Sequence, residues 1–262
     1  MRMKKKVILC SMLAMFAGTT AFAQLQDEKD VTITMDLQPI LQLNMSTPNQ
    51  IDFVFDDINE YYAGITKYAA TILKVSSTVN WDLYAIGNST GNVAPGLWDQ
   101  HIVYGTGGSG SSTNQLPLSL LELRQNGANN NATAATGTFA DYSAPFPAAS
   151  APSGSNSLYV DPANAGTPPT INDKYIAGHA GTTGVGLDGV TGGSYLTANT
   201  SASDYYYTID YRILPGLPAI FPMAFDPSGT VPQDLVTVNG PGFYAQPGVY
   251  SMYVQYILLE DQ

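Results

Sequence analysis

The chain has 262 residues, of which 44% are hydrophobic and only 12% are charged. This composition excludes a disordered polyelectrolyte, a coiled coil and a multi-span membrane protein. The formal net charge of −11 argues against a nucleic-acid partner, whose phosphates need a basic face. The 25 glycines, 17 prolines and 17 tyrosines favour strands joined by turns over helices.

The first 23 residues have the three-part layout of a secretory signal peptide. Four basic residues precede an apolar stretch from Val7 to about Ala17, and the small-residue site Ala21-Phe22-Ala23 comes before Gln24. The apolar stretch is too short to span a bilayer, so we expect cleavage after Ala23 and no integral membrane span in the mature chain. The expected location is the cell surface or the extracellular medium, with the periplasm as a further option.

Cleavage changes both the charge and the thiol content of the protein. Four of the ten basic residues and none of the 21 acidic ones lie before the cleavage site, so the mature chain carries a net charge of −15. Cys10 is the only cysteine and leaves with the signal, so no disulfide stabilises the mature protein. Residues 24–262 are long enough to bury a core, and we expect them to form a single domain.

The N-terminal part of the mature chain is rich in predicted strands. Val31–Leu37 alternates apolar and polar residues strictly, which is the two-residue period of a half-buried strand. Ile51–Phe55 gives a second short strand. Thr71–Ile86 also alternates and places Trp81 on its apolar face. This run is either one long strand or two strands that cross from sheet to sheet, and alternation leaves both open.

A loop-rich middle segment, residues 87–204, holds 18 of the 25 glycines. Leu116–Arg124 is its clearest ordered part. Alternation returns in Tyr205–Ile213 and in a final strand, Tyr250–Leu259. The fold class that we predict is therefore all-β: an antiparallel β-sandwich, Ig-like or jelly-roll-like, with long Gly/Ser/Asn-rich loops.

Motifs of catalysis and of cofactor binding are not recognisable in the sequence. Gly184–Gly189 spells a dinucleotide-binding motif but lacks the strand and helix that the motif requires on either side. His101 and His179 are isolated, and a glycosidase would need two carboxylates facing across a cleft. We expect no enzyme, no cofactor and no metal site. Two interpretations of the segment Asp56–Glu60 are kept: a calcium site and, more simply, an acidic turn.

Two strands of the sequence resemble those of bacterial surface β-sandwiches. Val79–Tyr84, which contains Trp81-Asp82-Leu83, and Pro247–Tyr256 are similar to strands of the WxL-type cell-surface domains and of the fimbrial and spore-coat-U-like group. The resemblance covers the two ends, roughly half of the mature chain. It implies a Greek-key sandwich with a structural or adhesive role at the surface.

The final strand, Tyr250–Leu259, is the candidate partner-binding strand. It carries no Lys, Arg or Pro, the residues that commonly stop a strand edge from pairing with another chain. A central position in its own sheet is equally compatible with the pattern. The candidate residues on its apolar face are Tyr250, Met252, Val254 and Tyr256.

The leading hypothesis for function is an exported structural or adhesive protein of a bacterial surface. The most specific version of this hypothesis is a fibre subunit that assembles by strand addition. Self-association is the partner interaction that this hypothesis requires. The alternative is a carbohydrate-binding module that stacks a surface glycan on exposed tyrosines, since the run Tyr205–Tyr207 must point to both faces of a strand.

Overall fold

The computed structural model describes residues 29, 31–105, 112–126, 142–147, 156–161, 167–169, 175–178, 189–196, 205–214, 224–225, 232–233 and 244–260. The chain divides into two units, residues 1–38 and residues 39–262. All helices and strands of the described residues lie in the second unit.

In the first unit, Val31–Leu37 forms neither helix nor strand, every residue is exposed, and no described strand pairs with it. The prediction of a half-buried strand here is therefore wrong. Alternation predicts a segment with one apolar face, but burial of that face needs a second surface, and the described residues provide none.

One sheet of the second unit has the strand order β1-β2-β9-β6, with β8 as a further neighbour of β2. All of its pairings are antiparallel. Its strands are β1 (Leu41–Met45), β2 (Ile65–Ser77), β9 (Tyr206–Ile213), β6 (Glu122–Asn126) and β8 (Gly193–Ser194).

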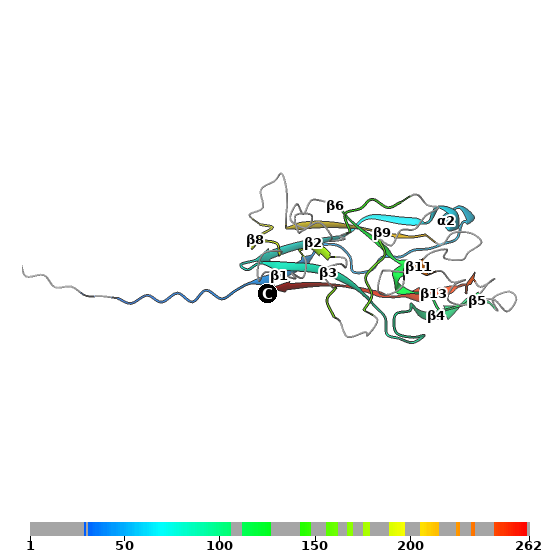
Figure 1. Ribbon diagram of the computed structural model, residues 1–262, viewed down its shortest axis with the longest axis horizontal. Coiled ribbons are helices and arrows are strands. Elements are labelled where there is room, and N and C mark those ends of the chain that lie inside the picture. The colour runs from blue at the N-terminus through cyan, green and yellow to red at the C-terminus, as the bar shows by residue number, and fades with distance from the viewer. Residues whose placement is uncertain are drawn as a thin grey trace, which may run out of the picture. The chain divides into compact units, whose positions relative to one another are not determined.

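A second antiparallel sheet has the order β14-β3-β7 and packs against the first (Figure 1). It is formed by β14 (Tyr253–Glu260), β3 (Trp81–Asn88) and β7 (Tyr175–Ala177). The prediction of an all-β antiparallel sandwich is thereby confirmed. Because β2 and β3 belong to different sheets, Thr71–Ile86 is two strands that cross between sheets. The Ser77 hydroxyl closes the turn by donating to the Val79 carbonyl at 2.7 Å.

The remaining elements are short. Six further strands form three two-stranded sheets: β4 (Asp99–Val103) with β13 (Gly248–Ser251), β5 (Ser112–Thr113) with β12 (Tyr244–Ala245), and β10 (Ala224–Phe225) with β11 (Pro232–Gln233). Two short helices complete the set: α2 (Ile58–Ala63) and the 3-10 helix η1 (Leu118–Leu120).

The hydrophobic core lies between the two sheets and follows the alternation of their strands. Leu73 and Val75 of β2 and Tyr207 of β9 face Trp81 and Leu83 of β3, and all five are at most 1% exposed. Strand β3 is buried on both faces, because Tyr84 and Ile86 on its other face pack with Tyr175 of β7. Seven of the eight residues of β3 are buried.

Two further strand predictions differ from the structure. Ile51–Phe55 alternates partly buried with exposed residues, but it forms no strand and pairs with no described strand. The final strand Tyr250–Leu259 is interrupted at Met252, where the chain leaves β13 and enters β14. The interruption follows from pairing: β13 binds β4, whereas β14 binds β3, and a strand that changes partners at the end of a sandwich bends between them.

Candidate functional site

The candidate site is the outer edge of β14, the side of this strand that faces away from β3. Strand β14 pairs with β3 over all eight of its residues, from Tyr253 opposite Asn88 to Glu260 opposite Trp81. It stands at the end of its sheet, and no described strand pairs with its outer edge. The structure therefore favours an edge position over the central position that the sequence left open.

The backbone groups at this edge follow from the hydrogen bonds of β3. Trp81 exchanges two backbone hydrogen bonds with Val190, at 3.0 and 2.8 Å, so its own N–H and C=O point away from β14. Because these groups alternate along an antiparallel strand, Tyr84 and Ile86 bond to their partners on β14, Ile257 and Gln255. The intervening residues of β14 direct their N–H and C=O groups to the outer edge: Val254, Tyr256 and Leu258.

The side chains of the same three residues face the core of the sandwich. Val254, Tyr256 and Leu258 pack against the main cluster but remain only partly buried. On the opposite face, Tyr253 is 56% exposed and Gln255 is exposed too. A strand placed at this edge would thus gain backbone hydrogen bonds and would also cover apolar surface.

A chain of three hydroxyl groups fixes β14 to the opposite sheet. The hydroxyls of Thr71 on β2 and Tyr211 on β9 share a hydrogen bond of 2.7 Å. The Tyr211 hydroxyl is also hydrogen-bonded to that of Tyr256 on β14. The polar tip of Tyr256 is thereby satisfied inside the sandwich, as a buried phenol requires.

Burial raises the pKa of several tyrosines in and around this network. It places the pKa of Tyr256 well above 10, and the neighbouring Tyr211 adds to the effect because two phenolates would repel each other. Burial also raises the pKa of Tyr211, against an opposing effect of its hydrogen bond with Thr71. The pKa of Tyr250 rises to about 12, again through burial.

These shifts predict a loss of stability at alkaline pH. The unfolded tyrosines ionise near pH 10 while the folded ones stay protonated, so the unfolded state binds fewer protons and the free energy of unfolding falls as pH rises above 10. Each such group contributes a slope of about 1.4 kcal/mol per pH unit until its folded pKa is reached. Urea melts between pH 9 and 12 measure the slope. Tyr256→Phe should make it shallower, and equal slopes would contradict the assignment.

The four candidate residues do not share one environment. Val254 and Tyr256 lie on β14, and Met252, between the two strands, packs against the same core. Tyr250 belongs to β13 and packs in a separate cluster with Leu116 and Leu120. Its hydroxyl donates to the Gln246 carbonyl at 2.7 Å. Tyr250 is therefore not part of the edge, an exclusion that the unbroken alternation of the sequence could not reveal.

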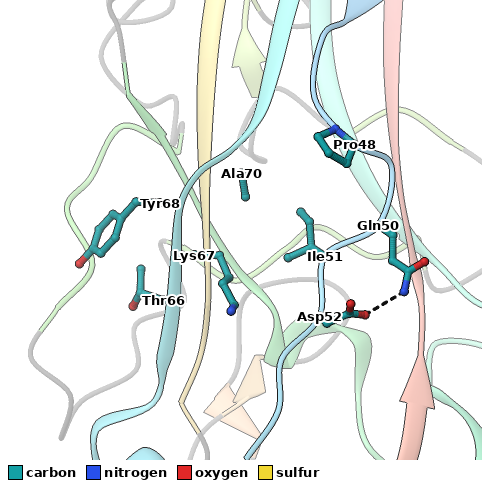
Figure 2. Close-up of a pocket in the computed structure, with 8 residues that line it drawn as sticks. All are labelled: Pro48, Gln50, Ile51, Asp52, Thr66, Lys67, Tyr68 and Ala70. Carbon is teal, nitrogen blue, oxygen red and sulfur yellow. Dashed lines mark hydrogen bonds between the residues drawn. The ribbon is translucent and has the colours of Figure 1, made fainter.

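The sequence also missed a groove beside β2. It has a volume of about 430 Å³ and lies between the extended residues Pro48–Asp52 and Thr66–Ala70 of β2 (Figure 2). On one wall, the Gln50 amide donates to the Asp52 carboxylate at 3.0 Å. No backbone hydrogen bond among the described residues joins the two walls. Within the β2 wall, Ala69 has a φ of 49° at the irregularity between Lys67 and Thr71 in the pairing of β2 with β9.

The acidic run Asp56–Glu60 forms a helix cap. Asp57 is the N-cap of α2 and accepts from the Asn59 N–H at 2.7 Å, while the Glu60 carboxylate accepts from the Asp57 N–H at 3.2 Å. Two of the three carboxylates are therefore occupied by backbone donors. Over the described part of the chain, no group of three or more His, Cys, Asp or Glu side chains could hold a metal ion.

This cap leads to a matched pair of variants. Asp57→Ala removes the cap and should lower the free energy of unfolding by about 1 kcal/mol. Asp56→Ala removes a carboxylate of equal charge from the preceding position, where the side chain is exposed and only the backbone N–H is bonded to Glu60. We expect a change below about 0.5 kcal/mol for Asp56→Ala in urea melts. Equal losses would contradict the cap.

The described tyrosines range from fully buried to exposed. Five are buried at 3% exposure or less. The three most exposed tyrosines belong to different parts of the fold: Tyr68 on β2, Tyr104 after β4 and Tyr253 on β14. A row of exposed rings on one strand, as the glycan hypothesis expects, is not present among the described residues.

Other candidates from the sequence lie elsewhere. His101 on β4 shares a hydrogen bond of 2.6 Å with the Ser251 hydroxyl. His179 and residues 184–188 lie outside the described residues. Within the described ranges, no helix is both long and apolar enough to cross a membrane. The chain matches no protein-family model, and a search of curated proteins returned no match.

Proposed function

We propose that the protein is an exported structural or adhesive component of a bacterial surface, and that its copies associate through the outer edge of β14. The observation that carries the proposal is this edge: an eight-residue strand with no described partner on its outer side and no Lys, Arg or Pro along its length. The signal-like first 23 residues support export.

Strand addition fits this edge for two physical reasons. Backbone hydrogen bonds to a new strand supply affinity, and the alternate side chains of that strand meet pockets that supply specificity. Val254, Tyr256 and Leu258 offer both, since their backbone groups face outward and their side chains are incompletely covered. A monomer with such an edge is prone to association, whereas a fibre uses it.

Val254→Pro tests the proposal at a single backbone group. Proline removes the N–H of Val254, which points outward, and leaves the ladder between β14 and β3 intact, as edge strands tolerate. We expect the mature protein to form oligomers that grow with concentration in sedimentation velocity and appear as filaments in negative stain. Val254→Pro should remain monomeric with an unchanged circular dichroism spectrum.

A second pair of variants keeps the test decisive if Val254→Pro fails to fold. Tyr253→Lys places a charge on the edge strand, and Tyr104→Lys makes the same change at a side chain of nearly equal exposure, 58% against 56%, away from β14. Only Tyr253→Lys should weaken association. A protein that stays monomeric at millimolar concentration, or equal effects of the two variants, would overturn the proposal.

Export has its own test. Mass spectrometry of the protein recovered from the envelope or the medium should give a chain that begins at Gln24. Retention of residues 1–23, or recovery from the cell interior alone, would overturn the surface role.

A further inference from the structure

The groove between residues 48–52 and 66–70, here called the β2 groove, has the size of a small-ligand site. Its volume of about 430 Å³ falls within the range of about 300–1,000 Å³ that is usual for such sites. Both walls contribute aliphatic and polar residues to its lining, and the aliphatic ones are Pro48, Ile51 and Ala70. A lining of this mixed kind fits a ligand that has both apolar and hydrogen-bonding groups.

A β-bulge shapes the β2 wall of this groove. The pairing of β2 with β9 passes from Lys67 opposite Tyr211 to Thr71 opposite Ile209, so that residues 68–70 stand against Asp210 alone. The alternation of β2 is interrupted there, and three residues in succession, 67–69, are exposed. Bulges re-aim side chains and are common beside functional sites. Here the bulge coincides with the groove.

The backbone at the centre of this bulge is strained. Ala69 has a φ of 49°, in the left-handed region that residues with a Cβ rarely adopt, and it is the only described residue other than glycine with a positive φ. Asp210 on β9 is 2% exposed, and its carboxylate accepts from the Ala69 N–H at 2.7 Å. Strain that is fixed by its surroundings in this way clusters at ligand sites. It is an observation independent of the shape of the groove.

The polar groups of the groove can both donate and accept hydrogen bonds. The Lys67 ammonium is a donor and has no ion-pair partner among the described residues. On the opposite wall, the hydrogen bond from Gln50 occupies Oδ1 of Asp52 and leaves Oδ2 as an acceptor. Figure 2 shows the side chains of Lys67 and Ile51 directed into the space between the walls, whereas the Tyr68 ring points away from residues 48–52. Recognition in this groove therefore needs no stacking on a tyrosine ring.

We propose that the β2 groove binds a neutral sugar unit of an oligosaccharide. A pyranose ring has hydroxyl groups around its rim and C–H groups on its faces. The Asp52 carboxylate would accept from sugar hydroxyls and the Lys67 ammonium would donate to one. The aliphatic lining would cover a C–H face of the ring. This inference goes beyond the proposed function, because the groove lies on the sheet of β2 and the association of copies uses β14 of the other sheet.

Two other classes of ligand agree less well with the lining. An acidic ligand would meet the Asp52 carboxylate and the net charge of −15 on the mature chain. A purely apolar ligand would cover Lys67 and Asp52 without giving them hydrogen-bond partners, which costs free energy. A neutral sugar supplies hydroxyl partners for both groups and an apolar surface for Ile51.

Binding of oligosaccharides to the mature protein tests the proposal. A glycan array that carries mannose, glucose, galactose and N-acetylglucosamine oligosaccharides beside uronic-acid and sialic-acid ones should show binding to neutral members alone. Isothermal titration calorimetry with the neutral oligosaccharides that bind then gives the affinity. Lys67→Gln and Asp52→Asn should each weaken it by about tenfold or more, because each removes a charge-assisted hydrogen bond to a hydroxyl.

Each of these variants has a control that makes the same change outside the groove. Asp36→Asn alters a pair of the same kind as Gln50–Asp52, since the Gln38 amide donates to the Asp36 carboxylate at 2.7 Å. Lys29→Gln neutralises another exposed lysine. Both controls should leave the affinity within about twofold, and all four variants should keep the circular dichroism spectrum of the parent. Equal effects of variants and controls would overturn the groove as the binding site.

The outcomes separate this inference from the proposed function. Val254→Pro should bind the oligosaccharides as tightly as the parent protein, because its change lies on the other sheet. Sugar binding by a protein that stays monomeric would retain the inference and overturn association through β14. Association without binding to any neutral oligosaccharide, or binding to acidic ones alone, would overturn the inference and leave the proposed function standing.

Discussion

Trp81→Ala should lower the free energy of unfolding by about 3–5 kcal/mol, the range for removing a fully buried tryptophan from a core. Trp81 is 0% exposed at the start of β3, and its ring meets that of Tyr207 edge to face, with centroids 6.1 Å apart. The pair joins the two sheets across the core. Removing the indole leaves a cavity that the surrounding strands cannot close without losing other contacts.

Trp98→Ala is the matched control for this experiment. The Trp98 side chain is only partly buried and packs against both the main core and a smaller cluster, and its indole N–H donates to the Pro117 carbonyl at 3.1 Å. Its replacement should cost less than that of Trp81. Urea melts followed by far-UV circular dichroism measure both changes. A loss below about 1 kcal/mol for Trp81→Ala would mean that Trp81 does not lie in the central core.

The inner strands were predictable because apolar and polar residues alternate along their whole length. Tyr205–Ile213 and the two halves of Thr71–Ile86 alternate in sequence and form β9, β2 and β3 in the structure. Alternation reports that one face of a segment is apolar. It does not report which neighbour covers that face, so the same pattern also occurs in Val31–Leu37 and Ile51–Phe55, which pair with no described strand.

The candidate site was only partly predictable for a related reason. The lack of Lys, Arg and Pro marked the final strand as an unprotected edge, and β14 does stand at the end of its sheet. The break at Met252 was not visible, because Tyr250 continues the alternation of Val254 and Tyr256. Pairing partners that are far apart in sequence decide such a break, as β4 and β3 do here.

Alternation in the sequence also does not reveal that the polar face of β9 is covered. Thr208, Asp210 and Arg212 alternate with the apolar residues of β9, but Asp210 and Arg212 are 2% and 5% exposed. Residues 142–147 of the loop-rich middle segment contact this face: the Pro147 carbonyl accepts from the Arg212 guanidinium at 2.6 Å, and the Phe146 ring lies 4.7 Å from it. Charged side chains that are buried beneath residues 142–147 need hydrogen-bond or ion-pair partners.

Glu122 is the partner of Arg212, and the pair should be strongly coupled. The two residues are opposite each other on β6 and β9, and the Arg212 Nε donates to the Glu122 carboxylate at 2.5 Å. Both side chains are at most 6% exposed. Glu122→Gln leaves the guanidinium buried without its counter-charge and should cost about 3–5 kcal/mol in the free energy of unfolding. Lys67→Gln neutralises an exposed charge and should cost less than about 0.5 kcal/mol.

A double-mutant cycle separates this pairing from simple loss of packing. Arg212→Met alone leaves a buried carboxylate and should be as damaging as Glu122→Gln, whereas Glu122→Met combined with Arg212→Met leaves no buried charge and should cost far less than the sum of the single changes. Urea melts at pH 7 of the single and double variants, with Glu122→Met alone to close the cycle, give the coupling energy. Additive losses would mean that the two charges are stabilised independently, with the Pro147 carbonyl and the Phe146 ring sufficient for Arg212.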